Sequence, residues 1–228
     1  MRKFSVILSN VGSMADRFVP DGYGQPYSLA QLFERVSKIP QVTGVELVGT
    51  WHVREDNVKE LQSNLDHYGL KLASIIPDHF GRAYWKHGSF SARNPEVRRR
   101  AVEHAKEMMD VASELGGHLI NLWPGQDGYD YLFQSDYIQA HDWIVEGIRE
   151  VCRHRSDVRV SLEYKLKEPR THSYISTATA TLLIVQEVGA DNCGITIDFG
   201  HSLNAYETPA ETAALLKRHG NKLFHIHM

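Results

Sequence analysis

The sequence has few cysteines and no long apolar stretch. Only two of its 228 residues are cysteine, Cys152 and Cys193, and they lie far apart in apolar surroundings. This spacing argues against a disulfide framework and favours a reducing compartment. No apolar run approaches the roughly 20 residues of a membrane-spanning helix, and the first residues show no signal-peptide pattern. We therefore expect a soluble cytoplasmic protein with no membrane partner.

Charge of one sign is not concentrated anywhere in the chain. Lysine and arginine total 25 against 28 acidic residues, and the densest basic cluster, RNPEVRRR at 93–100, is typical of an exposed helix start. Nucleic acids require an extended basic surface, so we expect no nucleic-acid partner. The 13 histidines are the one compositional excess, and they indicate metal or proton chemistry.

Short apolar runs with the character of β-strands alternate with helical patterns. The seven runs are residues 4–10, 43–49, 71–78, 117–124, 158–165, 193–200 and 222–228. The clearest helix follows Asn94 as N-cap, has Pro95 in its first turn and ends at Gly116. Strands that alternate with helices at this spacing predict a parallel sheet with helices outside it. We therefore predict an α/β fold, a (β/α)8 TIM barrel made by residues 1–228 as one domain.

Two features bear on the alternatives to this barrel. The segment SNVGSMADRF at 9–18 carries no glycine-rich dinucleotide fingerprint, which disfavours an open doubly wound sheet. The seventh run reaches Met228, so the eighth strand that closes such a barrel has no counterpart. We expect a barrel that is incomplete at its C-terminus, with a seven-stranded open variant as the alternative.

Polar side chains collect near the ends of the last three runs. In a strand, residues two apart share a face, so Glu163 and Lys165 lie on the side opposite to their apolar neighbours. The same alternation points Asp198 inward in the sixth run. In the seventh run it points His227 inward and Phe224 toward the helices. Because active sites of barrels lie at the C-terminal ends of strands, we expect the polar set to share one volume.

Two carboxylates and an imidazole in one volume are ligands for a divalent ion such as Mn²⁺, Co²⁺, Mg²⁺ or Zn²⁺. Without a cation, Glu163 and Asp198 would repel each other. Taken singly, Glu163 could pair with Lys165, Asp198 could cap a helix, and His227 could be a structural histidine. Their coincidence at consecutive strand ends, with His201 just beyond, favours metal ligation.

The positions of four further residues along the runs suggest a role for each of them. Trp123 ends the fourth run, where an aromatic ring can form a wall for a sugar. His79 follows the third run and is a candidate substrate contact. Glu46 shares the inward face of the second run, and both a supporting and a catalytic role remain open for it. His225 lies one layer deeper than His227 and is expected to be structural.

Several motifs resemble the xylose isomerase-like barrels, in particular their rhamnose and xylose isomerase branch. LEYKLKEPR at 162–170 is similar to the family's fifth-strand signature of a metal-binding glutamate followed by a catalytic lysine. IDFGH at 197–201 resembles the sixth-strand signature, and FHIH at 224–227 resembles the seventh strand. LWPGQDG at 122–128 is similar to the stretch that ends strand four.

This resemblance implies a set of site residues and a reaction. It implies a metal site made of Glu163, Asp198, His201 and His227. It implies catalysis by Lys165 and Glu163, and substrate contacts from Trp123, Glu168 and His201. The reaction implied is aldose–ketose isomerisation by a 1,2-hydride shift in a homodimer or homotetramer.

Two other functions remain open beside this isomerase. A ketose 3-epimerase of the same superfamily would use two glutamates as acid and base, the second of them on strand eight, and would have no need of Lys165. A non-catalytic barrel would bind no metal tightly and turn over no sugar.

Overall fold

One seven-stranded parallel sheet dominates the computed structural model, which describes residues 3–14, 19 and 21–228. Its strands follow one another in space in chain order. The strands of this sheet are β1 (Phe4–Ile7), β2 (Val42–Val48), β3 (Lys71–Ile76), β4 (Leu119–Leu122), β6 (Arg159–Glu163), β8 (Cys193–Asp198) and β9 (Leu223–His227). A separate antiparallel pair consists of β5 (Gly128–Tyr129) and β7 (His172–Ser173). All seven predicted strands are therefore confirmed.

Helices connect successive strands of the sheet. They are α1 (Leu29–Ser37), α2 (Val58–Tyr68), α3 (Pro95–Glu114), α4 (Tyr137–His154), α5 (Ala178–Val188), α6 (Phe199–Asn204) and α7 (Pro209–Arg218), with short 3₁₀ turns η1 (Leu8–Val11) and η2 (Ala83–Trp85). Residues 15–18 of the segment tested for a dinucleotide fingerprint lie outside the described residues. No helix in the described part of the chain is both long and apolar enough to span a bilayer.

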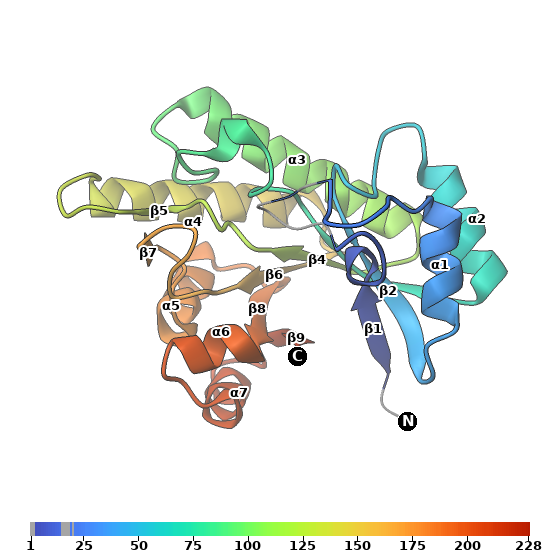
Figure 1. Cartoon of the computed structure of the whole chain (residues 1–228). Coiled ribbons are helices and arrows are strands. Elements are labelled where there is room, and N and C mark those ends of the chain that lie inside the picture. The colour runs from blue at the N-terminus through green and yellow to red at the C-terminus, as the bar shows by residue number, and fades with distance from the viewer. Residues whose placement is uncertain (1–2, 15–18, 20) are drawn as a thin grey trace.

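The sheet is curled, and the long helices lie on its outer side (Figure 1). Strands β1 and β9 form its two edges, and each contributes residues to a groove of about 870 Å³ between them. Among the described residues no strand pairs with the outer edge of either β1 or β9. The main apolar core lies between sheet and helices, while a small cluster of Val48, Ile76 and Phe80 lies apart from it.

Local sequence signals set the helix ends where they were predicted. The Asn94 side chain accepts a hydrogen bond from the Glu96 backbone N–H at the start of α3, and Pro95 occupies the first turn. Gly116 follows the end of this helix with a φ of +71°, a conformation that glycine adopts without strain. The predicted cap and stop of this helix are confirmed.

The last strand departs from simple alternation. Ile195 pairs with Leu223 and Thr196 pairs with His225, so Phe224 is an extra residue in β9. Its ring packs over Gly194, where an added Cβ would lie only 2.5 Å from it. Gly194 shares the inward face of β8, so the prediction that Phe224 faces the helices is wrong. The cause is the β-bulge, which shifts the alternation by one residue.

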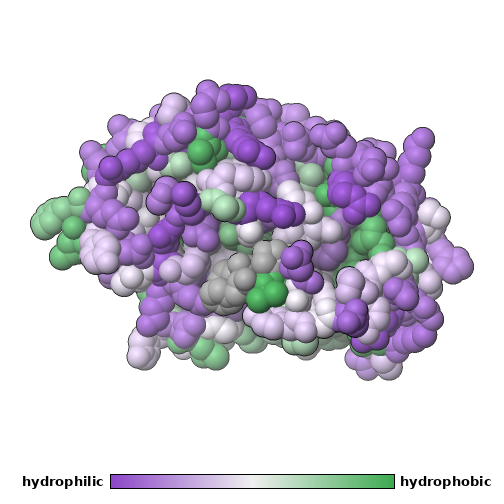
Figure 2. All heavy atoms as spheres, turned by 45° about the horizontal axis from the view of Figure 1, so that its top comes forward, coloured by the Kyte–Doolittle hydropathy of each residue, from purple (hydrophilic) through white to green (hydrophobic). Residues whose placement is uncertain are grey.

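The outer surface is mostly hydrophilic on the face that Figure 2 shows. Hydrophobic side chains gather at its left edge, over the loop between β5 and α4. Tyr131, Leu132 and Phe133 are exposed there. This apolar loop lies apart from the polar strand ends described next.

Candidate functional site

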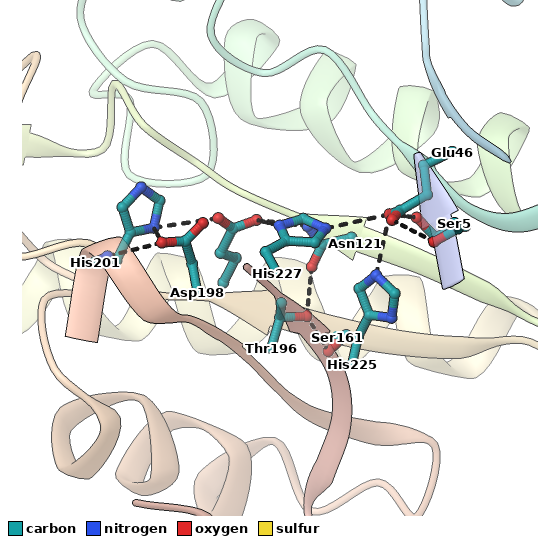
Figure 3. A network of polar contacts seen from close by, with 11 residues as sticks. Ser5, Glu46, Asn121, Ser161, Thr196, Asp198, His201, His225 and His227 are labelled. Atoms are coloured by element: carbon teal, nitrogen blue, oxygen red, sulfur yellow. Dashed lines mark hydrogen bonds and ion pairs between the residues drawn. The ribbon is translucent and has the colours of Figure 1, made fainter. Parts of the chain in front are cut away.

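The C-terminal ends of three neighbouring strands bring together Glu163, Asp198 and His227. One ligand atom from each lies within 4.8 Å of the others. Nδ1 of His227 lies 3.2 Å from Oε2 of Glu163, and Nδ1 of His201 lies 3.2 Å from Oε1 of the same carboxylate. Figure 3 shows Asp198, His201 and His227 converging on this space. The structure thus gathers the three residues that the sequence directed to one volume, and it brings His201 next to Glu163.

A chain of buried hydrogen bonds orients Glu163. Asn121 donates from Nδ2 to Oε2 of Glu163 at 2.6 Å, and the Thr196 hydroxyl donates to Oδ1 of Asn121 at 2.6 Å. Ser161 in turn lies 2.6 Å from Thr196. Sequence reasoning missed Asn121, although a lone asparagine two residues before Trp123 in an apolar strand was a usable signal. Its place on the inward face follows from that spacing.

The charges of the cluster act strongly on one another. Burial raises the pKa of the Glu163 carboxyl, but contacts with His201 and His227 outweigh it and hold that pKa well below its usual range. Burial lowers the pKa of His227, while its contacts with Glu163 and Glu46 raise it to about 11. The carboxylates of the cluster therefore stabilise a positive charge that lies between them.

One interpretation of Asp198, that it caps a helix, is confirmed, while its role as a metal ligand stays a prediction. Its Oδ1 accepts a hydrogen bond of 2.7 Å from the backbone N–H of His201 and so caps α6. That cap fixes His201 in the first turn of the helix, facing Glu163. A carboxylate carries a second oxygen, so the cap leaves Asp198 able to serve as a ligand as well.

Glu46 and His225 form a second contact with the cluster. Glu46 reaches it from β2, and its Oε2 lies 3.1 Å from Nε2 of His225 and 3.2 Å from Nε2 of His227. Both a supporting and a catalytic role were left open for Glu46. Its hydrogen-bond contact with His227 is the contact expected of a supporting residue. His225 sits beside Glu46, which agrees with a structural role.

An aromatic wall faces the polar cluster across a pocket of about 230 Å³. The Trp123 ring lies 4.9 Å from that of Phe80, centroid to centroid, and the Phe80 ring lies 5.8 Å from that of Trp51. His201 stacks on Trp123 at 6.4 Å. Sequence reasoning missed Trp51 and Phe80 because both lie in loops, where strand periodicity gives no direction. The pocket thus offers one charged side and one apolar side.

Lys165 and Glu168 stand at the edge of this pocket. Lys165 lines it and is nearly buried, with Nζ 5.4 Å from the centroid of the Trp123 ring. Nζ also donates a hydrogen bond of 2.6 Å to Oε2 of Glu168. Glu168 itself is about half exposed and is not among the described residues that line the pocket. The structure therefore places Glu168 as the partner of Lys165 rather than as a lining residue.

His79 does not face the pocket, and the expectation of a substrate contact is corrected. Its side chain is fully buried, and Nε2 donates to the backbone oxygen of Ala101 at 3.0 Å. The ring packs edge-on against Trp85, Phe90 and His104. The loop after β3 turns this histidine toward α3, away from the strand ends.

His79 and His52 are expected to make the fold acid-labile. Burial lowers the pKa of His79 to about 3 and that of His52 to about 4. Nδ1 of His52 also accepts a hydrogen bond from the Val48 backbone, which requires the neutral ring. Below a pH of about 6.5 these two histidines become protonated in the unfolded chain but stay neutral in the folded chain. Each of them therefore lowers the free energy of unfolding by about 2 kcal/mol at pH 5.

Chemical unfolding between pH 7 and pH 5 measures this effect. His79→Gln keeps a donor for Ala101 and should remove the His79 share of the loss, whereas His219→Gln, at an exposed position, should leave the loss unchanged. Equal pH dependence in both variants would contradict the assignment.

The donor set of the cluster fits a divalent cation. Nδ1 of His201 is buried and lies 3.2 Å from Oε1 of Glu163, but it makes no hydrogen bond with any of the residues that the structure describes. An imidazole nitrogen in this position beside two carboxylates can bind a metal ion through its lone pair. Mixed oxygen and nitrogen ligands suit Mn²⁺, Co²⁺ or Zn²⁺ better than Ca²⁺.

Comparison with known proteins relates this chain to sugar isomerases. The chain is 28% identical over 178 residues to the xylose isomerase of Thermus thermophilus, covering 76% of this chain and 46% of that protein. It is 28% identical over 202 residues to a probable sugar isomerase of Rhizobium meliloti, covering 84% and 46%. The chain therefore spans about half the length of these curated relatives.

Solved structures share the fold at low identity. A D-tagatose 3-epimerase-like protein superposes with a TM-score of 0.73 at 22% identity, covering 98% of this chain and 75% of that one. The D-psicose 3-epimerase of Clostridium cellulolyticum gives 0.75 at 17%, covering 100% and 72%. These likenesses confirm the TIM-barrel fold. A sequence model described as Xylose isomerase-like TIM barrel matches residues 33–228, and the chain belongs to that family.

Proposed function

We propose that this protein interconverts an aldose and a ketose by a 1,2-hydride shift that depends on a divalent cation. The observation that carries the proposal is the convergence of Glu163, Asp198, His201 and His227 beside Lys165 on one side of an aromatic-walled pocket. The relatives named xylose isomerase and sugar isomerase support it.

Each side of the pocket has its own task. A bound divalent cation supplies Lewis acidity that lowers the pKa of a sugar hydroxyl. Glu163 and Asp198 hold that cation by charge, and His201 and His227 add nitrogen ligands. Lys165 donates a hydrogen bond to the carbonyl oxygen of the sugar as negative charge moves onto it.

The aromatic wall serves the same reaction. Trp51, Phe80 and Trp123 present apolar faces on which the C–H groups of a sugar pack. They also exclude water from the charged side, which strengthens every electrostatic contact there.

A ketose 3-epimerase is the second candidate, supported by structural neighbours that are named as such. Epimerisation at C3 needs an acid and a base on opposite faces of the sugar. Among the described residues that line the pocket, the carboxylates are Glu163 and Asp198, which lie together on one side of it. The nearly buried Lys165 instead favours the hydride shift.

The fate of deuterium at C2 separates these functions. The protein, loaded with Mn²⁺ or Co²⁺, is incubated with a panel of aldoses labelled at C2 and with the matching ketoses. The hydride shift predicts ketose that retains the label at C1, and no product after metal removal. Label lost to water while ketose still forms would show isomerisation through an enediol instead of a hydride shift, and ketoses that change only at C3 would support epimerisation. Bound metal without turnover of any sugar would indicate a non-catalytic barrel.

The assembly and the cellular location remain predictions. We propose a cytoplasmic homodimer or homotetramer, as the family resemblance implies. Light scattering after size-exclusion chromatography measures the assembly directly, and a monomer at micromolar concentration would contradict it.

A further inference from the structure

His227 lies between two carboxylates that contact different nitrogens of its ring. Nδ1 lies 3.2 Å from Oε2 of Glu163, on the side of the candidate metal site. Nε2 lies 3.2 Å from Oε2 of Glu46, on the other side. Figure 3 shows the ring of His227 with the Glu46 carboxylate beyond one of its nitrogens.

When a cation displaces one proton from His227, this arrangement selects one form of the neutral ring. A carboxylate only accepts hydrogen bonds, so Nε2 must carry the hydrogen that it donates to Glu46. Neutral imidazole has one N–H group and one lone pair, so the lone pair then lies on Nδ1. Nδ1 is the nitrogen that faces Glu163 and the cation site.

Glu46 is itself held from three strands. Ser5 of β1 donates to its Oε1 at 3.0 Å, and Ser74 of β3 donates to its Oε2 at 2.5 Å. His225 of β9 contacts Oε2 at 3.1 Å, and only 3% of Glu46 is exposed. Together with His227, four donors satisfy this carboxylate without any metal ion. Glu46, His225 and His227 also lie close enough together to hold a cation, but these four hydrogen bonds already occupy the Glu46 carboxylate, which favours its role as a fixed hydrogen-bond acceptor.

We propose that Glu46 is a positioning residue that holds His227 with its proton on Nε2 and so makes Nδ1 the metal-binding atom. The inference rests on the proposed function, because it needs a cation between Glu163, Asp198 and His227. A carboxylate behind a ligating histidine orients the ring and raises its basicity. Loss of such a partner lowers metal affinity by roughly 10- to 100-fold.

Cadmium NMR on the whole chain tests the assignment without any change at Glu46. The protein carries ¹⁵N-labelled histidine and bound ¹¹³Cd²⁺, and the His227 signals are identified by their loss in His227→Gln. We expect the spectrum to show coupling between cadmium and Nδ1 of His227. It should also show a covalently attached hydrogen atom on Nε2. Cadmium coupled to Nε2, or to the Nε2 atoms of both His225 and His227, would overturn the positioning role.

Glu46→Gln tests the consequence for affinity. The variant keeps the shape of the side chain, and we expect it to bind Cd²⁺ and Co²⁺ 10- to 100-fold more weakly. The proton of the neutral His227 ring should no longer be confined to Nε2. Asp127→Asn is the matched control, because Asp127 is an equally buried carboxylate whose described side-chain partners are Ser89 and Ser91. Its affinity and its His227 signals should equal those of the unaltered chain.

The outcomes separate the two claims. Unchanged metal affinity in a folded Glu46→Gln variant overturns the positioning role alone. Failure of the unaltered chain to bind cadmium at all overturns the proposed function, and this inference with it.

Discussion

Replacing Glu163 by glutamine is expected to lower the affinity for Mn²⁺ or Co²⁺ by about 100-fold or more and to reduce sugar turnover to background. Glu163 is the carboxylate that both His201 and His227 approach, and Asn121 holds it in place. The amide keeps the shape but removes the negative charge, and supporting partners of metal ligands alone are worth 10- to 100-fold. Titration calorimetry with Co²⁺, followed by a turnover assay, measures both losses.

Glu168→Gln is the matched control for this change. It makes the same chemical substitution at the rim of the pocket, where Glu168 contacts Lys165 rather than the cluster. Its metal affinity should stay within a few-fold of the unaltered chain. Equal losses in both variants would point to a general charge effect, and unchanged binding in Glu163→Gln would remove it from the ligand set.

Lys165→Met is expected to lower kcat by roughly 100- to 1,000-fold while metal affinity stays unchanged. Methionine replaces the apolar stem of this nearly buried side chain and removes the ammonium group. That group is proposed to bind the oxygen on which charge develops, and loss of one such donor typically costs this much. Because the contact strengthens in the transition state, kcat should fall more than KM rises.

The neighbouring lysine provides the comparison. Lys167 lies two residues further along the chain and is exposed, so Lys167→Met should retain full turnover. Full turnover in Lys165→Met, with the metal still bound, would instead transfer the assignment from the hydride shift to epimerisation.

The sheet and its helices could be predicted because their signals are local. Asn94, Pro95 and Gly116 define the ends of α3 through their own backbone preferences. Phe224 could not be placed in this way, because its direction depends on how β9 pairs with β8. The bulge that turns it inward is a property of two strands, not of one.

The polar cluster that we propose as the metal site was predictable for a related reason. Glu163, Asp198 and His227 lie at the C-terminal ends of adjacent parallel strands, and the period of two sets the face on which each lies. The loops obey no such period. Phe80 turns into the pocket while His79, its neighbour, turns away from it, and only the packing of the loop against α3 decides which.

Anomalous diffraction from crystals grown with Co²⁺ locates the proposed metal ion. We predict a cobalt peak between the carboxylates of Glu163 and Asp198, within bonding distance of Nδ1 of His227. A map at millimolar Co²⁺ with no peak at that position, or with a peak only beside Glu46 and His225, would contradict it.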